Sequence, residues 1–328
     1  MEARLLPVNG FVALVQQAGD SRTRPLLREL GFHLIALELP LNVPGGPTHG
    51  TVVADAVAWH PETGIFLVAE AKSGRNFDET QAVRYSGVTP EIVQRATKAD
   101  IPRGVVPSVV VVYCVMEAAL ARIRVPLRAV APSSIIVAFD QSANSTSVLL
   151  DDPGRVLRAD TTQVDWQSPI PALIRLDQDS PPAQFVPPVR AELVAAQSRS
   201  DPIITVPTLA ERVVPYLGFY TNHPTTVITH RVEEAARRIA QEKPDDYRLI
   251  PSSSTNKTPS VAIRRTPEDY DRRGRTQSYQ ALARTKSRRK TQDDPNQLDL
   301  LAVLDIDLVD TDRHTDSPSS ENEGVPNE

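Results

Sequence analysis

Two apolar runs separated by a four-residue link constrain the fold of this chain more than any other feature. The runs cover residues 51–60 and 65–72, and the link between them reads Pro-Glu-Thr-Gly. Proline and glycine in so short a link predict a tight turn. Two strand-like runs around such a turn predict a β-hairpin. The hairpin would carry Asp55 of the first run back toward Glu70 at the end of the second.

The charged residues of this hairpin form a chemically meaningful set. Glu70 and Lys72 are two positions apart, so on a strand they share a face. Asp55 lies inside an apolar run, where an unpaired carboxylate is costly to bury unless it is hydrogen-bonded or coordinated. Two carboxylates and a lysine at one end of a sheet can hold Mg²⁺ and orient a water against a phosphodiester.

This pattern resembles the PD-(D/E)XK nuclease superfamily, in which an Asp, a variable gap and (Asp/Glu)-x-Lys follow one another. After Lys72, the segment Gln81-Ala-Val-Arg-Tyr85 is similar to the Gln-x-x-x-Tyr motif of the RecB-like branch. The i,i+4 spacing places Gln81 and Tyr85 on one face of a helix. The resemblance covers roughly residues 25–140. One departure is Ala54, which stands where the nominal pattern has Pro.

The resemblance implies a restriction-endonuclease-like fold and a Mg²⁺ cofactor for which Mn²⁺ substitutes. It also implies an upstream acidic or histidine ligand, for which Glu29 is our candidate, with His33 and His49 behind it. The other implied roles fall on the hairpin and the following helix: Asp55, Glu70 and the backbone of Ala71 bind metal, Lys72 stabilises developing charge, and Gln81 and Tyr85 contact substrate or brace the ligands.

Propensity and periodicity predict alternating helices and strands, an α/β chain, and the resemblance implies that the strands form a central mixed sheet flanked by helices. The predicted order is helix, three strands, helix, strand, helix, strand. We expect helices at residues 8–20, 24–30, 78–99 (with a break at Pro90) and 117–124, and strands at 33–41, 51–59, 65–72, 105–116 and 133–140. Residues 1–150 would form this nuclease-like domain.

The rest of the chain divides by composition. Residues 151–207 are rich in proline and are interpreted as a connector. Residues 208–292 would form a basic unit, with helices at 209–220 and 229–243 and two strands within 246–265. Helices followed by a hairpin are compatible with a winged helix, which docks a helix in the major groove of DNA. Residues 293–328 have the polar, acidic composition of a disordered tail.

Charge is unevenly distributed, although the formal net charge is only −5. Residues 260–292 carry ten basic and three acidic residues, whereas residues 293–328 carry eleven acidic residues and one arginine. Clustered positive charge favours contact with nucleic-acid phosphates. The residues expected to make such contacts are Arg75 and Arg84 beside the predicted site and Arg264, Arg265, Arg272, Arg273, Arg288, Arg289 and Lys290 in the basic segment.

Composition excludes several other classes of protein. The one cysteine, Cys114, rules out a disulfide within the chain and a cysteine-ligated cluster. The longest apolar run, around residues 105–116, is too short to span a bilayer. The first residues lack a signal-peptide pattern. We therefore expect a cytoplasmic protein without a membrane partner. A Walker A motif is also missing from the sequence.

These observations predict a Mg²⁺-dependent deoxyribonuclease, acting in antiviral defence against foreign DNA or in DNA repair. The alternative is a non-catalytic DNA-binding or regulatory subunit of a larger complex that keeps the nuclease fold. DNA is the expected partner in both cases. Further subunits of such a complex, or a second copy of the chain, are compatible with the sequence.

Overall fold

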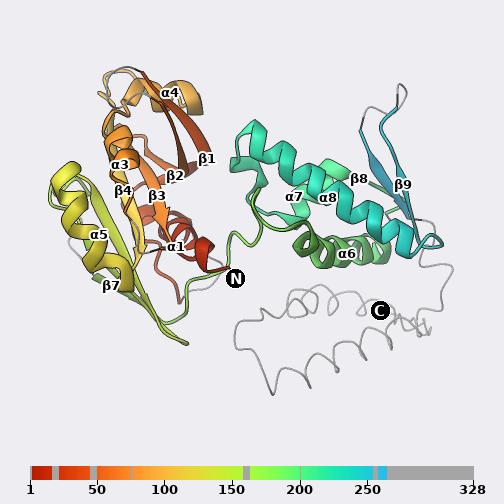
Figure 1. Ribbon diagram of the computed structural model, residues 1–328. Helices are drawn as coiled ribbons and strands as arrows, with labels where there is room; N and C mark the ends of the chain where they lie inside the picture. The colour runs from red at the N-terminus through yellow and green to blue at the C-terminus, as the bar shows by residue number, and fades with distance from the viewer. Residues whose placement is uncertain are drawn as a thin grey trace, which may run out of the picture. The chain divides into compact units, whose positions relative to one another are not determined.

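A mixed seven-stranded sheet, in which the strands follow one another in chain order, organises the N-terminal half of the protein (Figure 1). The pairs β1–β2 and β2–β3 are antiparallel, and the pairs β3–β4 and β4–β5 are parallel. The last two pairs, β5–β6 and β6–β7, are antiparallel again. The strands are β1 (His33–Val43), β2 (Gly50–His60), β3 (Ile65–Lys72), β4 (Ser108–Met116), β5 (Ile135–Gln141), β6 (Thr146–Asp151) and β7 (Gln163–Trp166). The predicted α/β class is confirmed.

The computed structural model describes residues 2–16, 22–44, 50–74, 77–157, 163–199, 201–253 and 258–263. These ranges all belong to one compact unit, residues 1–269. The second unit, residues 270–328, lies outside the described residues. The predicted acidic tail and the basic residues from Arg264 to Lys290 therefore also lie outside them.

The predicted hairpin of β2 and β3 is present. His60 pairs with Ile65, and the four residues between them form the turn. Gly64 closes this turn at φ +74°, and a Cβ there would lie 2.4 Å from Cγ1 of Val105. Only glycine satisfies both the left-handed backbone and the close approach of Val105. The turn thereby sets the register that decides which residues of β2 and β3 face each other.

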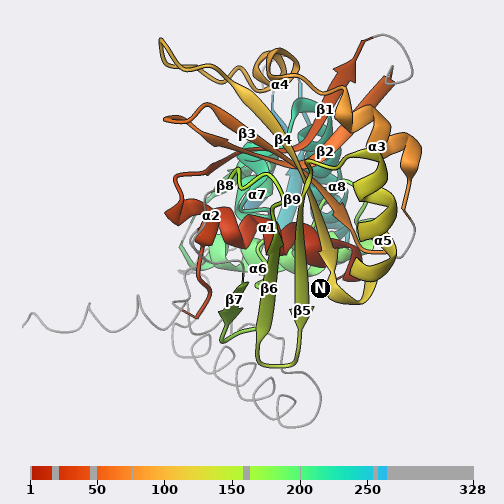
Figure 2. The same ribbon diagram turned by 90° about the vertical axis from the view of Figure 1, so that its left-hand side faces the viewer.

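Helices cover both faces of the sheet (Figure 2). Phe11 and Leu14 of α1 share a buried cluster with Leu67 of β3 on one face. Ile123 of α5 shares a cluster with Val115 of β4 on the other face. The helices of this half are η1 (Ala3–Leu5), α1 (Leu6–Val15), α2 (Leu26–Glu29), α3 (Glu79–Ser86), α4 (Pro90–Thr97) and α5 (Glu117–Val130). Their order relative to β1–β5 is the predicted one, with the break before Pro90.

The segment 151–207, interpreted from its prolines as a connector, contains regular structure. It includes β7, the helix α6 (Pro182–Ser198) and the short strand β8 (Ile203–Thr205). Pro182 lies in the first turn of α6, where a missing N–H costs nothing. Phe185 and Val189 lie at helical spacing and are fully buried. Burial of this apolar face outweighs the unfavourable prolines within the helix.

A second, three-stranded sheet with helices follows. Its strands are arranged in the order β8-β10-β9 and pair antiparallel. We call residues 182–263 the helical module; it comprises α6, β8, α7 (Val206–Val213), η3 (Leu217–Phe219), α8 (Asn222–Glu242), β9 (Tyr247–Ile250) and β10 (Ser260–Ile263). Compared with the predicted helices, α7 ends earlier and α8 begins earlier in the chain.

Candidate active site

Asp55 and Glu70 are brought together by the register of the hairpin. Ala56 pairs with Ala69, so the next position along the ladder places Asp55 opposite Glu70. Side chains directly opposite each other on antiparallel strands project to the same face. Oδ2 of Asp55 accepts a hydrogen bond of 2.6 Å from the backbone N–H of Ala71. The carboxylate of Asp55 is thereby hydrogen-bonded to the backbone of the residue that follows Glu70.

Glu70 is the centre of a polar network between β3 and α3. Its Oε1 lies 2.7 Å from Nζ of Lys72 and accepts a hydrogen bond of 2.9 Å from Nε2 of Gln81. Its Oε2 lies 2.6 Å from the hydroxyl of Tyr85. Lys72 also donates to Oε1 of Gln81. Glu70 is only 5% exposed, so these partners offset the cost of burying its charge.

The helix α3 delivers Gln81 and Tyr85 to this network. Asp78 caps its N-terminus by accepting a hydrogen bond of 3.0 Å from the backbone N–H of Gln81. Tyr85 is buried, and its ring lies edge-on to Tyr113 with 6.3 Å between centroids. The hydroxyl of Tyr85 also lies 2.8 Å from the carbonyl oxygen of Val53. The capped helix thus fixes two side chains against one carboxylate.

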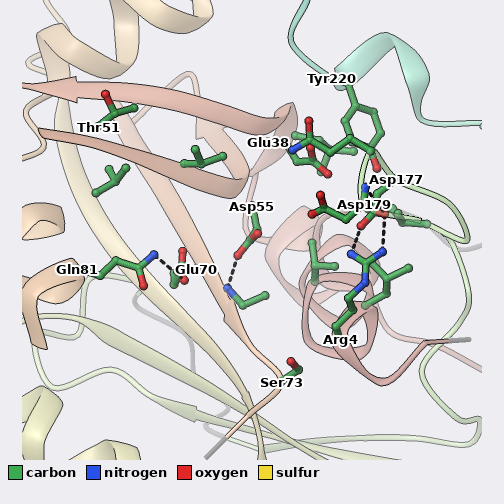
Figure 3. Close-up of a pocket in the computed structure, with 18 of the residues that line it drawn as sticks. Arg4, Glu38, Thr51, Asp55, Glu70, Ser73, Gln81, Asp177, Asp179 and Tyr220 are labelled. Atoms are coloured by element: carbon green, nitrogen blue, oxygen red, sulfur yellow. Dashed lines mark hydrogen bonds and ion pairs between the residues drawn. The ribbon is translucent and has the colours of Figure 1, made fainter. Parts of the chain in front are cut away.

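A pocket of about 560 Å³ opens beside these residues (Figure 3). It lies where β1, β2 and β3 approach the start of α3, and part of its wall comes from residues 174–179 and from Tyr220. The polar residues that line it are Arg4, Glu38, Thr51, Asp55, Glu70, Ser73, Asp78, Gln81, Arg84, Asp177, Gln178, Asp179 and Tyr220. Carboxylates outnumber cations in this lining, which favours a bound cation.

Glu38 is a pocket residue that the sequence analysis missed. Leu37 pairs with Ala56 and Leu39 with Ala54, so Glu38 lies opposite Asp55 across β1 and β2. Its backbone has φ +49°, an unusual value for a residue with a Cβ. Its buried Oε2 has no hydrogen-bond partner among the described residues. The available signal was the same as for Asp55, namely one acid inside an apolar strand.

Two of these carboxylates hold their protons more tightly than usual. Burial raises the pKa of Asp55 to about 7, and the neighbouring charge of Glu70 adds to the effect. Burial raises the pKa of Glu38 to about 8, with further contributions from Asp177, Asp179 and Asp55. Both shifts have the direction expected where several carboxylates share one poorly solvated pocket.

The far wall of the pocket is anchored to the N-terminus. The guanidinium of Arg4 donates two hydrogen bonds to the carboxylate of Asp177, and the one from Nη2 to Oδ1 measures 2.6 Å. Burial alone would raise the pKa of Asp177, but the hydrogen bonds from Arg4 and Ser180 hold it below its usual range. Asn9 on α1 pairs through its amide with both the N–H and the carbonyl of Ile174. The segment 174–180 is therefore fixed in place.

The predicted site residues divide into three groups. Asp55, Glu70, Lys72, Gln81 and Tyr85 come together as expected, and the Ala71 backbone and Arg84 join them at the pocket. Glu29 does not: it pairs with Arg24 at 2.8 Å on the exposed side of α2 and does not line the pocket. His33 is exposed and also absent from the pocket lining, whereas His49 and Arg75 lie outside the described residues.

The described ranges contain no group of three or more His, Cys, Asp or Glu side chains close enough to hold a metal ion. The donor set nevertheless suits Mg²⁺, which takes oxygen ligands, retains several waters and is commonly held by one or two carboxylates. The second oxygen of Asp55 is free of the Ala71 contact, and Oε2 of Glu38 has no hydrogen-bond partner in the part of the chain that the structure describes. These two oxygens and Glu70 lie on three adjacent strands.

No protein-family model, curated protein or solved structure matches this chain. Among the described helices, none is long and apolar enough to cross a membrane.

Proposed function

We propose that this protein is a Mg²⁺-dependent nuclease that hydrolyses DNA phosphodiester bonds, built on a restriction-endonuclease-like core. One observation carries the proposal. Asp55, Glu70 and Lys72 meet beside an acidic pocket, with Gln81 and Tyr85 both bonded to Glu70. The predicted order of helices and strands from α1 to β5 supports the same core. Its cellular role would be defence against foreign DNA or DNA repair.

Asp55, Glu70 and the carbonyl of Ala71 would hold the metal. Glu38 would take the place assigned to Glu29 once its carboxylate moves closer, since no three such side chains of the described residues are now grouped closely enough to hold a metal ion. Bound there, Mg²⁺ would polarise the scissile phosphate and lower the pKa of an attacking water. Lys72 would place its ammonium near the charge that develops on the phosphate oxygens. It is held for this role by Glu70 and Gln81.

Gln81 and Tyr85 would act through Glu70. Each donates to a different oxygen of that carboxylate, so together they fix the plane of the group. A fixed ligand keeps the metal and its water in the reactive geometry without reorganisation. Arg84 would bind a phosphate of the DNA strand, since it lines the pocket without an ion pair among the described residues.

The helical module would contribute a winged-helix arrangement. Its element order, α6-β8-α7-α8-β9-β10, and its sheet order, β8-β10-β9, support that proposal. Most of its described arginines are, however, paired with acids: Arg190 and Arg238 with Glu242, Arg199 and Arg212 with Glu192, and Arg237 with Glu233. Attraction to phosphates would then come mainly from the basic residues between Arg264 and Lys290.

One observation favours the alternative of a non-catalytic subunit. Oε1 of Glu70 already accepts from Lys72 and Gln81, and Oε2 accepts from Tyr85, so only the remaining lone pair of Oε2 is open to a metal unless one of these donors is released. Incubation of the full chain with supercoiled plasmid in Mg²⁺, Mn²⁺ or EDTA tests the choice. Nicking or linearisation only with metal is expected. Retained DNA binding without any cleavage would favour the non-catalytic subunit.

A further inference from the structure

Thr221, which precedes α8, does not use its hydroxyl as a helix cap. Threonine at this position normally accepts a hydrogen bond from a backbone N–H of the first turn. No such bond forms in α8. The hydroxyl of Thr221 instead donates to the backbone carbonyl of Glu38 at 3.1 Å. A local stabilising interaction of the helix is thus exchanged for a contact with the pocket strand.

A second contact joins the same two places. Tyr220 forms a parallel bridge with Leu37, the residue before Glu38. Tyr220 is buried and lines the pocket together with Glu38 (Figure 3). The helical module therefore contacts β1 through two consecutive residues, Tyr220 and Thr221. These contacts fall on the backbone of Leu37 and of Glu38.

The backbone of Glu38, which Thr221 contacts, is strained. Glu38 has φ +49°, and a non-glycine residue keeps such a conformation only where its surroundings impose it. Relaxation toward ordinary strand geometry would reorient the side chain relative to the pleat. No described residue holds Oε2 of Glu38 by a hydrogen bond. The hydrogen bond from Thr221 and the bridge between Tyr220 and Leu37 are contacts that hold the backbone at this place.

We propose that Thr221 is a positioning residue that holds Glu38 toward the pocket, so that the helical module completes the metal site of the sheet. The inference rests on the proposed function, because it assigns Glu38 to the metal. It also makes the placement of α8 and the affinity of the pocket for metal interdependent. A shift of α8 on binding a partner would change the position of a ligand on β1.

The test uses three variants of the full chain. Thr221→Val removes the hydroxyl and keeps the size of the side chain, whereas Thr221→Ser keeps the hydroxyl. Thr226→Val is the matched control, because Thr226 lies in the first turns of α8 and its hydroxyl donates within the helix to the carbonyl of Asn222 at 2.8 Å. The readouts are the Mn²⁺ dissociation constant by calorimetry and the Mg²⁺ concentration for half-maximal plasmid cleavage.

Thr221→Val should weaken Mn²⁺ binding roughly threefold to tenfold, the range expected for one hydrogen bond. Thr221→Ser and Thr226→Val should stay within about twofold of the wild type by the same measure. Wild-type affinity in Thr221→Val, or no recovery in Thr221→Ser, would overturn the positioning role while leaving the nuclease proposal standing. Absence of metal binding by the wild type would overturn both.

Discussion

Tyr85 and Glu70 meet at 2.6 Å, hydroxyl to Oε2, in a place that solvent hardly reaches. Tyr85 is 1% exposed and Glu70 is 5% exposed. The Tyr85 hydroxyl also lies within hydrogen-bond distance of the Val53 carbonyl, so one proton serves two acceptors on two strands. Burial and the charge of Glu70 raise the pKa of Tyr85 well above its ordinary value, which keeps the group a donor. The orientation of the Glu70 carboxylate depends on this donor.

Removal of that hydroxyl is our first prediction. Tyr85→Phe should reduce metal-dependent cleavage about tenfold and destabilise the fold by about 1–2 kcal/mol, because a buried carboxylate loses a donor. Tyr113→Phe is the matched control, since the hydroxyl of Tyr113 is buried and has no hydrogen-bond partner within the described ranges. Urea unfolding and single-turnover cleavage measure the two effects. Equal behaviour of the two variants would contradict the role given to Tyr85.

The second prediction concerns pH and stability. The pKa of Glu38 is raised to about 8 in the folded protein from an ordinary value of 4.5. Between these values the native state binds more protons than the unfolded state, so stability should fall as pH rises. Glu38→Gln stays neutral and should escape this fall.

Thermal unfolding at intervals from pH 5 to pH 9 measures the difference between wild type and Glu38→Gln. The variant should be nearly as stable as the wild type at the acidic end and should gain a growing advantage up to about pH 8. Added Mg²⁺ should stabilise the wild type at pH 8 more than the variant, because it binds the ionised native site. Parallel curves for the two proteins would show that folding does not raise the pKa of Glu38.

The third prediction concerns the one pocket arginine on α3. Arg84→Ala should weaken DNA binding and reduce the slope of log affinity against log salt by about one phosphate contact. Arg95→Ala on α4 is the control, because Arg95 is exposed and does not line the pocket. Fluorescence anisotropy over a salt series gives both slopes. An unchanged slope for Arg84→Ala would place the DNA elsewhere.

The fourth prediction tests the anchor of the far wall. Arg4→Ala leaves the carboxylate of Asp177 buried without its cation and should cost about 2 kcal/mol. Asp177 has a side chain 5% exposed, whereas that of Arg4 is 35% exposed, so the loss should be smaller than for a fully buried pair. The double variant Arg4→Ala/Asp177→Ala should recover part of the stability in urea unfolding. A double variant less stable than both single variants would refute the anchor.

The sequence was most informative where local signals agreed. The turn at Gly64 and the apolar runs around it define the hairpin, and the register then follows from the turn. The i,i+4 spacing puts Gln81 and Tyr85 on one face of α3, and both side chains donate hydrogen bonds to Glu70 from that face. These features depend on residues close in sequence, so propensity and periodicity suffice to predict them.

The missed features depend on contacts that propensity and periodicity do not show. Glu38 reaches the pocket through an irregular residue in β1, which no periodic pattern predicts. Glu29 looked suitable on its helix, but Arg24 pairs with it on the exposed side. The helix α6 forms despite internal prolines because its apolar face is buried. For Glu38 and α6, contacts with distant parts of the chain override the local signal, whereas Glu29 is drawn away by a partner only five residues before it.

Cleavage by site variants tests the central claim most directly. Wild type, Asp55→Asn and Lys72→Ala would be incubated with plasmid and labelled linear DNA in Mg²⁺, with Glu62→Gln as a control in the exposed turn outside the pocket. We predict metal-dependent cleavage by the wild type and Glu62→Gln and a loss of at least about a hundredfold in the other two. Equal cleavage by all four proteins, or none by the wild type, would contradict a nuclease site at Asp55, Glu70 and Lys72.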